Sequence, residues 1–329
     1  MSASIPVPSR PRAGLLSLVV PAYNESGAIL RVLDEASAVL ATMSVPAEII
    51  VVDDASRDDT AALVATRRGV RLLENPVNLG YGHSLLRGIA VAKGDVIAIC
   101  DADGSYDPAI LPELLARIEK GVDHAIAART GAWFNRPFLR RTVYRWLCQY
   151  VVGTRVPDAN SGLRVFRREV VDSVRADLCL GFSFTTSLTL ASFMSGYVTE
   201  FRPAGYRGRV GRSHVRFRDT LRTAQYLFQL VAAYNPLKLF FPLVVGLLAA
   251  GTGAALVGIW RGDLWFALAS VFGLAAAMLT GVAAHAYIVA RAGTRPIRHI
   301  GEARQWAVSS PADAAVRFQP GAETSPLER

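Results

Sequence analysis

Two carboxylates lie two residues apart at the end of an apolar run, in the order Asp101, Ala102, Asp103. In an extended turn both can face one hard divalent cation, which prefers oxygen ligands and can bridge the oxygens of a diphosphate. Asp53 and Asp54 follow another apolar run. For any one of these residues ordinary turn chemistry is the alternative. Acids gathered at one edge repel, however, and a shared cation or a set of ligand donors explains them best.

The elements that must position these acids alternate along the chain. Short β-rich runs alternate with helical patterns, typical of an α/β fold with a mostly parallel sheet and helices on its faces. Ligands bind such sheets beyond the carboxyl ends of the strands, where the acids lie. Ser56 is predicted to cap the helix after the second run. The predicted strands are Leu16–Val20, Glu48–Asp53, Val70–Glu74, Val96–Asp101 and His124–Ala128.

Other cofactor chemistry is not indicated. The three cysteines have no CxxC spacing, and the five histidines are scattered, so neither a disulfide framework nor a zinc cluster is supported. Gly80 and Gly82 lack the third glycine of a dinucleotide fingerprint and follow the third predicted strand rather than the first.

The apolar residues are concentrated near the carboxyl terminus. The 329 residues carry a net charge of +9, are 51% hydrophobic and have a mean hydropathy of +0.28. Two uncharged segments, 239–260 and 264–290, are each long enough to cross a hydrocarbon core of roughly 30 Å. Two membrane spans are the simplest interpretation, and membrane lipids are therefore expected partners.

Basic residues flank both predicted spans. Seven arginines and one acid lie between Arg202 and Arg222, three arginines follow the second span, and the connection 261–263 has no net charge. This pattern predicts a multi-pass protein of the cytoplasmic (inner) membrane with the catalytic domain and both termini in the cytoplasm. Anionic lipids explain the basic run better than nucleic acid does.

These patterns divide the chain into five parts. We expect a flexible lead over 1–13, a catalytic domain over 14–214 and an amphipathic interfacial helix over 215–236. A transmembrane hairpin over 237–290 and a mobile cytoplasmic tail over 291–329 follow. The apolar stretch 182–194 is too short for a third span and predicts a helix of the catalytic domain, lining a cleft or packed on the membrane surface.

Five motifs, in order, resemble family 2 glycosyltransferases with a GT-A fold. More narrowly, they are similar to the polyprenyl-phosphate glycosyltransferases, the branch that includes dolichol-phosphate-mannose synthases. The resemblance covers roughly residues 15–290. The motifs are Val19–Glu25, Val52–Ser56, Asn78–Gly82, Asp101–Asp103 and Asp158–Arg167.

The resemblance implies a donor site for a nucleotide diphosphate sugar. Asp101 and Asp103 match the pair that grips the donor diphosphate through Mg²⁺ or Mn²⁺, with Ser105 where mannose synthases commonly have Gln. In the family, other motif positions hold the base and ribose of the donor. The residues of this chain at those positions are Pro21, Tyr23, Glu25, Asp53 and Asp54.

The resemblance also implies an acceptor side. Arg129 and Arg140 resemble positions that bind phosphate, which a planar guanidinium can hold in bidentate fashion. Asp158 is placed near the reacting sugar or acceptor, with helix or turn capping as its alternative. The basic segment 206–214 resembles a loop in which Arg209 and Ser213 close over the donor phosphates.

The expected reaction is transfer of one sugar from a UDP- or GDP-sugar to polyprenyl phosphate at the cytoplasmic membrane face, with inversion at the anomeric carbon. One alternative is a glycosyltransferase whose acceptor is a hydroxyl of a glycolipid or lipid-linked glycan, which would need Asp158 as a base. A membrane scaffold with a degenerate GT-A domain is the non-enzymatic alternative. An oligomer is compatible with each of these functions.

Overall fold

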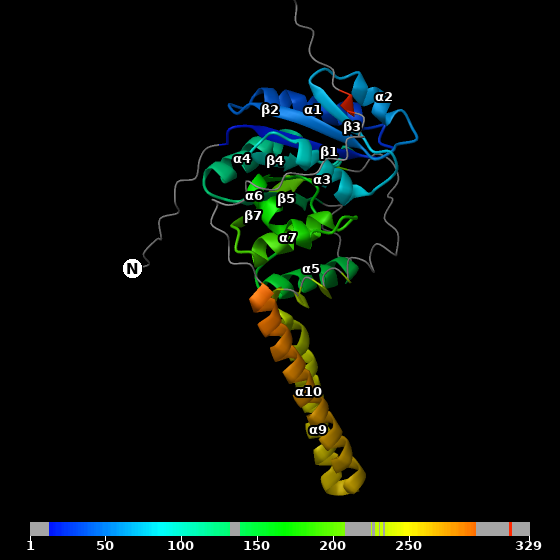
Figure 1. Ribbon diagram of the computed structural model, residues 1–329, viewed down its shortest axis with the longest axis vertical. Helices are drawn as coiled ribbons and strands as arrows, with labels where there is room; N and C mark the ends of the chain where they lie inside the picture. The colour runs from blue at the N-terminus through cyan, green and yellow to red at the C-terminus, as the bar shows by residue number, and fades with distance from the viewer. Residues whose placement is uncertain are drawn as a thin grey trace, which may run out of the picture. The chain divides into compact units, whose positions relative to one another are not determined.

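The structure, a computed structural model, describes residues 13–131, 139–207, 225, 228–229, 231–232, 234–293 and 316–317. The chain divides into two compact units, each described by itself below (Figure 1). The first unit comprises Met1–Asp219 and Ser309–Arg329, and the second comprises Thr220–Val308. Most of the predicted interfacial helix over 215–236, and nearly all of the predicted lead over 1–13, lie outside the described residues.

The first unit is built on a mostly parallel sheet, which confirms the predicted fold class. Its order is β7-β5-β6-β4-β1-β2-β3-β8, and β6 runs antiparallel to both β4 and β5. The two-residue strand β8 pairs antiparallel with β3 at the edge. The strands are β1 (Leu16–Ala22), β2 (Ala47–Asp53), β3 (Val70–Glu74), β4 (Val96–Ile99), β5 (His124–Thr130), β6 (Arg164–Arg167), β7 (Thr199–Gly205) and β8 (Val316–Arg317).

All five predicted strands are present, with small differences at their ends. Strand β4 stops at Ile99, two residues earlier than predicted, although the Cys100 amide still donates to the carbonyl of Val19 at 3.2 Å. Asp101 therefore lies in the turn that follows the strand. Strands β6 and β7 lie beyond the predicted runs.

Helices cover the sheet and bury their apolar faces on it. Helix α7 is buried along most of its length, from Phe184 to Ser192, and it contacts both β7 and α5 (Figure 1). The apolar stretch predicted as a helix of the catalytic domain is thus an internal packing element. The helices are α1 (Ile29–Ala41), α2 (Thr60–Ala65), α3 (Tyr81–Val91), α4 (Leu111–Glu119), α5 (Leu139–Val152), α6 (Arg168–Val174) and α7 (Phe184–Met194), with 3₁₀ turns at Pro108–Ile110 and Arg175–Asp177.

The loops after β1 and β2 are hydrogen-bonded to each other at the carboxyl edge of the sheet. The Asn24 amide donates to Ser56 Oγ at 2.9 Å, and the Arg57 amide donates to Asn24 Oδ1 at 2.7 Å. Asn24 and Ala55 both have positive φ angles, of 55° and 59°. The prediction of Ser56 as a helix cap is wrong, because α2 starts only at Thr60 and Ser56 joins the two loops instead.

The second unit contains two long apolar helices, α9 (Pro236–Arg261) and α10 (Asp263–Gly293), joined at Gly262. Gly262 has a φ of 93°, a conformation that L-residues rarely adopt. The helices pack closely where α9 has small residues, since a Cβ at Gly258 would lie 3.1 Å from the ring of Phe266. By length and composition both helices could cross a membrane.

Candidate active site

The two acids of the Asp101–Asp103 motif are held by different donors. The hydroxyl of Tyr81, the first residue of α3, donates to Asp101 Oδ1 at 2.8 Å. The amide of Ser105 donates to Asp103 Oδ1 at 3.0 Å. Burial, together with the charge of Asp101 and the hydrogen bond to it, raises the pKa of Tyr81 well above its ordinary value. The phenol therefore keeps its proton and remains a donor.

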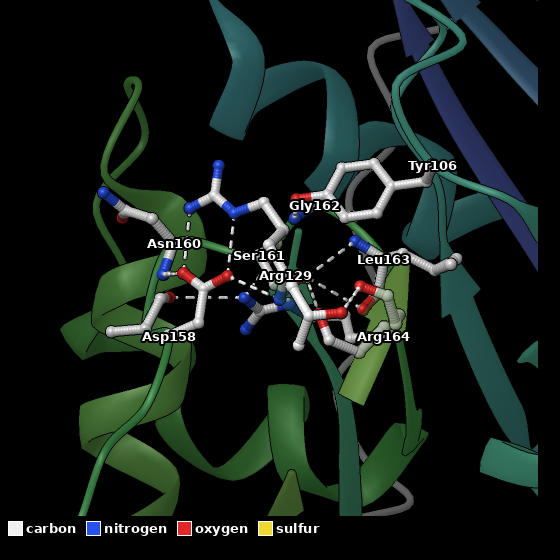
Figure 2. A network of polar contacts seen from close by, with 12 residues as sticks. Tyr106, Arg129, Asp158, Asn160, Ser161, Gly162, Leu163 and Arg164 are labelled. Atoms are coloured by element: carbon white, nitrogen blue, oxygen red, sulfur yellow. Dashed lines mark hydrogen bonds and ion pairs between the residues drawn. The ribbon is translucent and has the colours of Figure 1, made fainter. Parts of the chain in front are cut away.

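A second loop presses against the first acid. A Cβ built on Gly162 would lie 2.0 Å from Asp101 Oδ2, so only glycine leaves room for this carboxylate. The Gly162 amide donates to the hydroxyl of Tyr106 at 2.8 Å (Figure 2). The structure thus brings the segment 158–162 against the turn after β4, from a part of the sequence some sixty residues away.

The residues present fit a divalent cation shared with a diphosphate. Among the described residues, Ser105 Oγ is a buried hydroxyl without a hydrogen-bond partner, and such groups are rare unless a ligand completes them. No cluster of three or more metal-binding side chains of His, Cys, Asp or Glu occurs in the described part of the chain. Asp101, Asp103 and Ser105 would therefore supply part of an oxygen shell, which phosphate oxygens must complete.

Asp53 and Asp54, side by side in the sequence, have different environments. Asp54 accepts from the amides of Leu79 and Gly80, each at 2.8 Å, and from Asn75 Nδ2 at 2.6 Å. Its carboxylate thus fixes the loop that leads into α3. Asp53 Oδ2 accepts from the Ser56 amide at 3.0 Å, whereas its buried Oδ1 has no hydrogen-bond partner among the described residues.

Three other predicted donor-side residues lie at the same edge. Pro21 is buried within the end of β1, while Tyr23 and Glu25 follow it and are partly exposed. The Glu25 amide donates to Thr60 Oγ1 at 2.9 Å, which ties this loop to the start of α2. The structure therefore gathers Pro21, Tyr23, Glu25 and Asp53 at the carboxyl ends of β1 and β2.

Asp158 and Arg129 form a bidentate ion pair (Figure 2). Arg129 Nε lies 2.7 Å from Asp158 Oδ2, and Arg129 Nη2 lies 2.8 Å from Oδ1. The amides of Arg129 and Asn160 also donate to this carboxylate, at 3.1 and 3.2 Å. Burial alone would lower the pKa of the Arg129 guanidinium, but the hydrogen bonds and charge of Asp158 outweigh it and hold that pKa above its usual range.

Arg164 is a buried cation that sequence reasoning missed. Its guanidinium donates to the carbonyls of Ser161 and Ala159 in the loop before β6 (Figure 2). It also donates to the Thr185 carbonyl and to Thr189 Oγ1 of α7, each at 3.0 Å. Burial lowers the pKa of Arg164 to about 10, so it stays charged at neutral pH. Its only sequence signal was its place within the Asp158–Arg167 motif, which does not distinguish it from a surface arginine.

Aromatic rings and one ion-pair cluster border the two loops. The Arg129 guanidinium lies 5.4 Å from the ring centre of Tyr206, which packs edge-on against Tyr106. Arg207, at the start of the predicted basic loop, pairs with Glu35 and Asp107 at 2.8 and 2.7 Å. The predicted site residues Arg209 and Ser213 lie outside the described residues, as does the side chain of Arg140, although Arg140 belongs to α5.

A protein-family profile matches part of the first unit. The first unit has a mostly parallel sheet with an acidic turn, Asp101–Asp103, after the central strand β4. The profile of the family described as Glycosyl transferase family 2 matches residues 17–175. Residues 17–175 therefore match a family 2 glycosyltransferase domain, as the sequence predicts.

The relatives of the chain include a hexosyltransferase and undecaprenyl-phosphate sugar transferases. It is 29% identical to the low-salt glycan biosynthesis hexosyltransferase Agl6 of Haloferax volcanii, over 76% of this chain and 60% of that protein. It thus spans less than two thirds of that relative's length. It is also 29% identical to the undecaprenyl-phosphate 4-deoxy-4-formamido-L-arabinose transferase of Pseudomonas fluorescens, covering 75% of this chain and 76% of that protein.

Solved structures share the fold. Glucosyl-3-phosphoglycerate synthase from Mycobacterium tuberculosis, in complex with Mn²⁺, UDP-glucose and phosphoglyceric acid, superposes with a TM-score of 0.54 at 24% identity. The match covers 66% of this chain and 79% of that one. This likeness confirms the GT-A fold of the first unit.

Proposed function

We propose that this glycosyltransferase transfers a hexose from a UDP- or GDP-sugar to a polyprenyl phosphate at the cytoplasmic face of a membrane, with inversion at the anomeric carbon. The names of the relatives support a lipid-phosphate acceptor, since several are undecaprenyl-phosphate sugar transferases. The two long apolar helices support a membrane-bound enzyme. The orientation follows from the arginine-rich flanks of these helices.

The ion pair of Asp158 with Arg129 is the observation that favours a phosphate acceptor over a hydroxyl acceptor. Asp158 is the one carboxylate that sequence reasoning offers as a general base, yet four donors surround it and its side chain is only 4% exposed. A carboxylate committed in this way is a poor base. A hydroxyl acceptor needs a base, whereas a phosphate monoester, with a second pKa of about 6, is already largely ionised at neutral pH.

Bond changes in the proposed reaction balance without a base. An oxygen of the lipid phosphate attacks the anomeric carbon of the donor from the face opposite the leaving group. The bond from that carbon to the diphosphate breaks, and the nucleoside diphosphate leaves with the electron pair. Mg²⁺ or Mn²⁺, when bound, supplies positive charge that stabilises the leaving diphosphate.

The chain's own residues bring two anions together in this scheme. Asp101, Asp103 and Ser105 would hold the cation beside the donor diphosphate, and Asp53 would supply a buried acceptor oxygen for the nucleotide. Arg129, oriented by Asp158, binds the acceptor phosphate. Positioning and charge neutralisation of this kind can lower the barrier without covalent chemistry by the protein. Arg140, Arg209 and Ser213 remain predicted phosphate contacts.

A donor and acceptor screen tests the proposal. The full chain, purified in detergent, is incubated with Mn²⁺ or Mg²⁺, radiolabelled UDP- and GDP-sugars, and either undecaprenyl phosphate or a sugar-capped lipid. We expect label in the lipid phase only with the phosphate acceptor, and NMR of the product should show the inverted anomeric configuration. Asp101→Asn serves as the inactive control.

Each other outcome identifies a competing function. Label on the sugar-capped lipid but not on undecaprenyl phosphate would establish a hydroxyl acceptor and return Asp158 to the role of base. Failure to bind any nucleotide sugar in the presence of either metal would indicate a membrane scaffold.

A further inference from the structure

We propose that Tyr81 is a positioning residue for the cation site, whose hydroxyl sets the orientation of the Asp101 carboxylate. The inference rests on the proposed function, in which Asp101 and Asp103 hold a divalent cation with the donor diphosphate. The terminal torsion of an aspartate is broad, so a carboxylate in a turn needs an external partner to point in one direction. The Tyr81 hydroxyl, 2.8 Å from Asp101 Oδ1, is such a partner.

The two acids of the motif obtain their orienting donors in different ways. Asp103 accepts from a backbone amide two residues away, that of Ser105, so its orientation is local to the turn. Asp101 accepts from a side chain twenty residues earlier in the sequence. The orientation of Asp101 therefore depends on how firmly the first turn of α3 is placed.

That turn is held from two directions. Before it, Asp54 accepts from the amides of Leu79 and Gly80, each at 2.8 Å. Within it, the His83 amide donates to the Leu180 carbonyl at 3.0 Å. A Cβ at Gly82 would lie 2.6 Å from backbone atoms of the segment 179–180, so the turn packs directly on that backbone. Tyr81 lies between these anchored positions.

The Asp101 carboxylate is also confined on the Oδ2 side. A Cβ at Gly162 would come within 2.0 Å of that oxygen, which shows how closely the 158–162 loop approaches. The hydroxyl of Tyr81 on Oδ1 and the backbone of Gly162 beside Oδ2 thus leave the carboxylate little freedom to rotate. Partners that orient a metal ligand in this way typically contribute 10–100-fold to metal affinity.

The experiment measures Mn²⁺ binding directly. The full chain in detergent is titrated with Mn²⁺ at a fixed concentration of UDP or GDP, which supplies the phosphate oxygens of the shell. Unbound Mn²⁺ is followed by electron paramagnetic resonance, for the parent protein and for Tyr81→Phe, against the same titration without protein. The variant removes one oxygen and keeps the ring. Tyr197→Phe is the matched control. The Tyr197 hydroxyl donates to Ser173 Oγ at 2.8 Å. Tyr197 lies just before the start of β7, away from the acids at the carboxyl ends of the strands.

We expect Tyr81→Phe to weaken Mn²⁺ binding by about 10-fold. In the transfer assay the Mn²⁺ concentration for half-maximal rate should rise by a similar factor, while the rate at saturating Mn²⁺ stays within about threefold of the parent rate. Tyr197→Phe should change neither quantity. A loss of packing alone would instead lower the maximal rate and the melting temperature without being restored by metal.

Two results separate failure of this inference from failure of the proposed function. Mn²⁺ affinity of Tyr81→Phe within twofold of the parent value, while Asp101→Asn loses Mn²⁺ binding, would overturn the role of Tyr81 alone. Unchanged Mn²⁺ binding in Asp101→Asn would overturn the cation site itself. A fall in maximal rate that excess Mn²⁺ does not restore would also overturn the positioning role.

Discussion

Replacing Gly162 by alanine tests whether the close approach of two loops sets the position of Asp101, the first of the two acids proposed to bind the cation. The added Cβ would lie 2.0 Å from Asp101 Oδ2, against an ordinary contact distance that begins at 3.4 Å. The carboxylate or the loop must therefore move by about 1.4 Å, the difference between these two distances. Gly162 does not have a positive φ, so alanine is compatible with its backbone conformation.

The displacement should affect catalysis more than folding. A misplacement of about 1 Å can cost about 100-fold in rate, and we expect a loss of this order for Gly162→Ala at saturating metal. Overpacking typically costs about 1–3 kcal/mol, and the lower half of this range is expected because Asp101 is only partly buried and lies in a turn. Turnover with labelled donor and thermal unfolding of the same preparation measure the two effects.

Gly205→Ala is the matched control. A Cβ at Gly205, at the end of β7, meets no atom within 4 Å, and its φ is not positive. This variant should retain turnover within about twofold. If Gly162→Ala kept more than about a third of the parent turnover, the 158–162 loop would not set the position of Asp101, and the reasoning would be refuted.

Three other properties can be measured independently. In Arg129→Lys the lysine cannot make both parallel contacts with Asp158. KM for polyprenyl phosphate should therefore rise by about 10-fold, and by more than KM for the donor. Equal rises in the two KM values would assign Arg129 to the donor diphosphate. Burial and the nearby charge of Arg164 hold the pKa of His124 well below its ordinary value of 6.5, so below that pH the unfolded state binds a proton that the folded state refuses. The free energy of unfolding should therefore fall with acidification by up to about 1.4 kcal/mol per pH unit, and denaturant unfolding of His124→Gln should show a shallower dependence between pH 6.5 and 5; an unchanged slope would contradict this. A chain that ends near Arg212 keeps β1–β7 and should bind the donor with metal. Its transfer rate to bilayer-embedded lipid should fall more than its rate to a short soluble acceptor. An undiminished rate on bilayers would show that the apolar helices only anchor the protein.

The sequence determined the parallel core of the fold. A strand buried on both faces is a nearly continuous run of Val, Ile and Leu, and β1 and β2 are such runs, bounded by turn residues. The antiparallel strand β6 and the edge strand β7 were harder to recognise, because β6 is only four residues long and carries an arginine at each end. The long apolar helices were predictable because their length and uncharged composition are properties of the sequence alone.

The sequence also determined which residue types lie at the carboxyl edge, but not the hydrogen bonds or the role of each residue. Asp53 and Asp54 are equivalent in a motif, and only the folded chain gives Asp54 three donors and leaves an oxygen of Asp53 buried without one. Asp158 and Arg129 lie 29 residues apart, and their pairing depends on the return of the chain through β6.

Tertiary structure alone decided the contacts around Asp101. Tyr81 comes from the start of α3, Gly162 from the loop before β6, and the buried charge of Arg164 links that loop to α7. Side-chain orientation depends on atoms that approach from distant parts of the chain, and a linear pattern carries residue types and spacing but not these approaches. The sequence therefore determined which chemical groups are available, and the packing of distant segments determined how those groups are oriented.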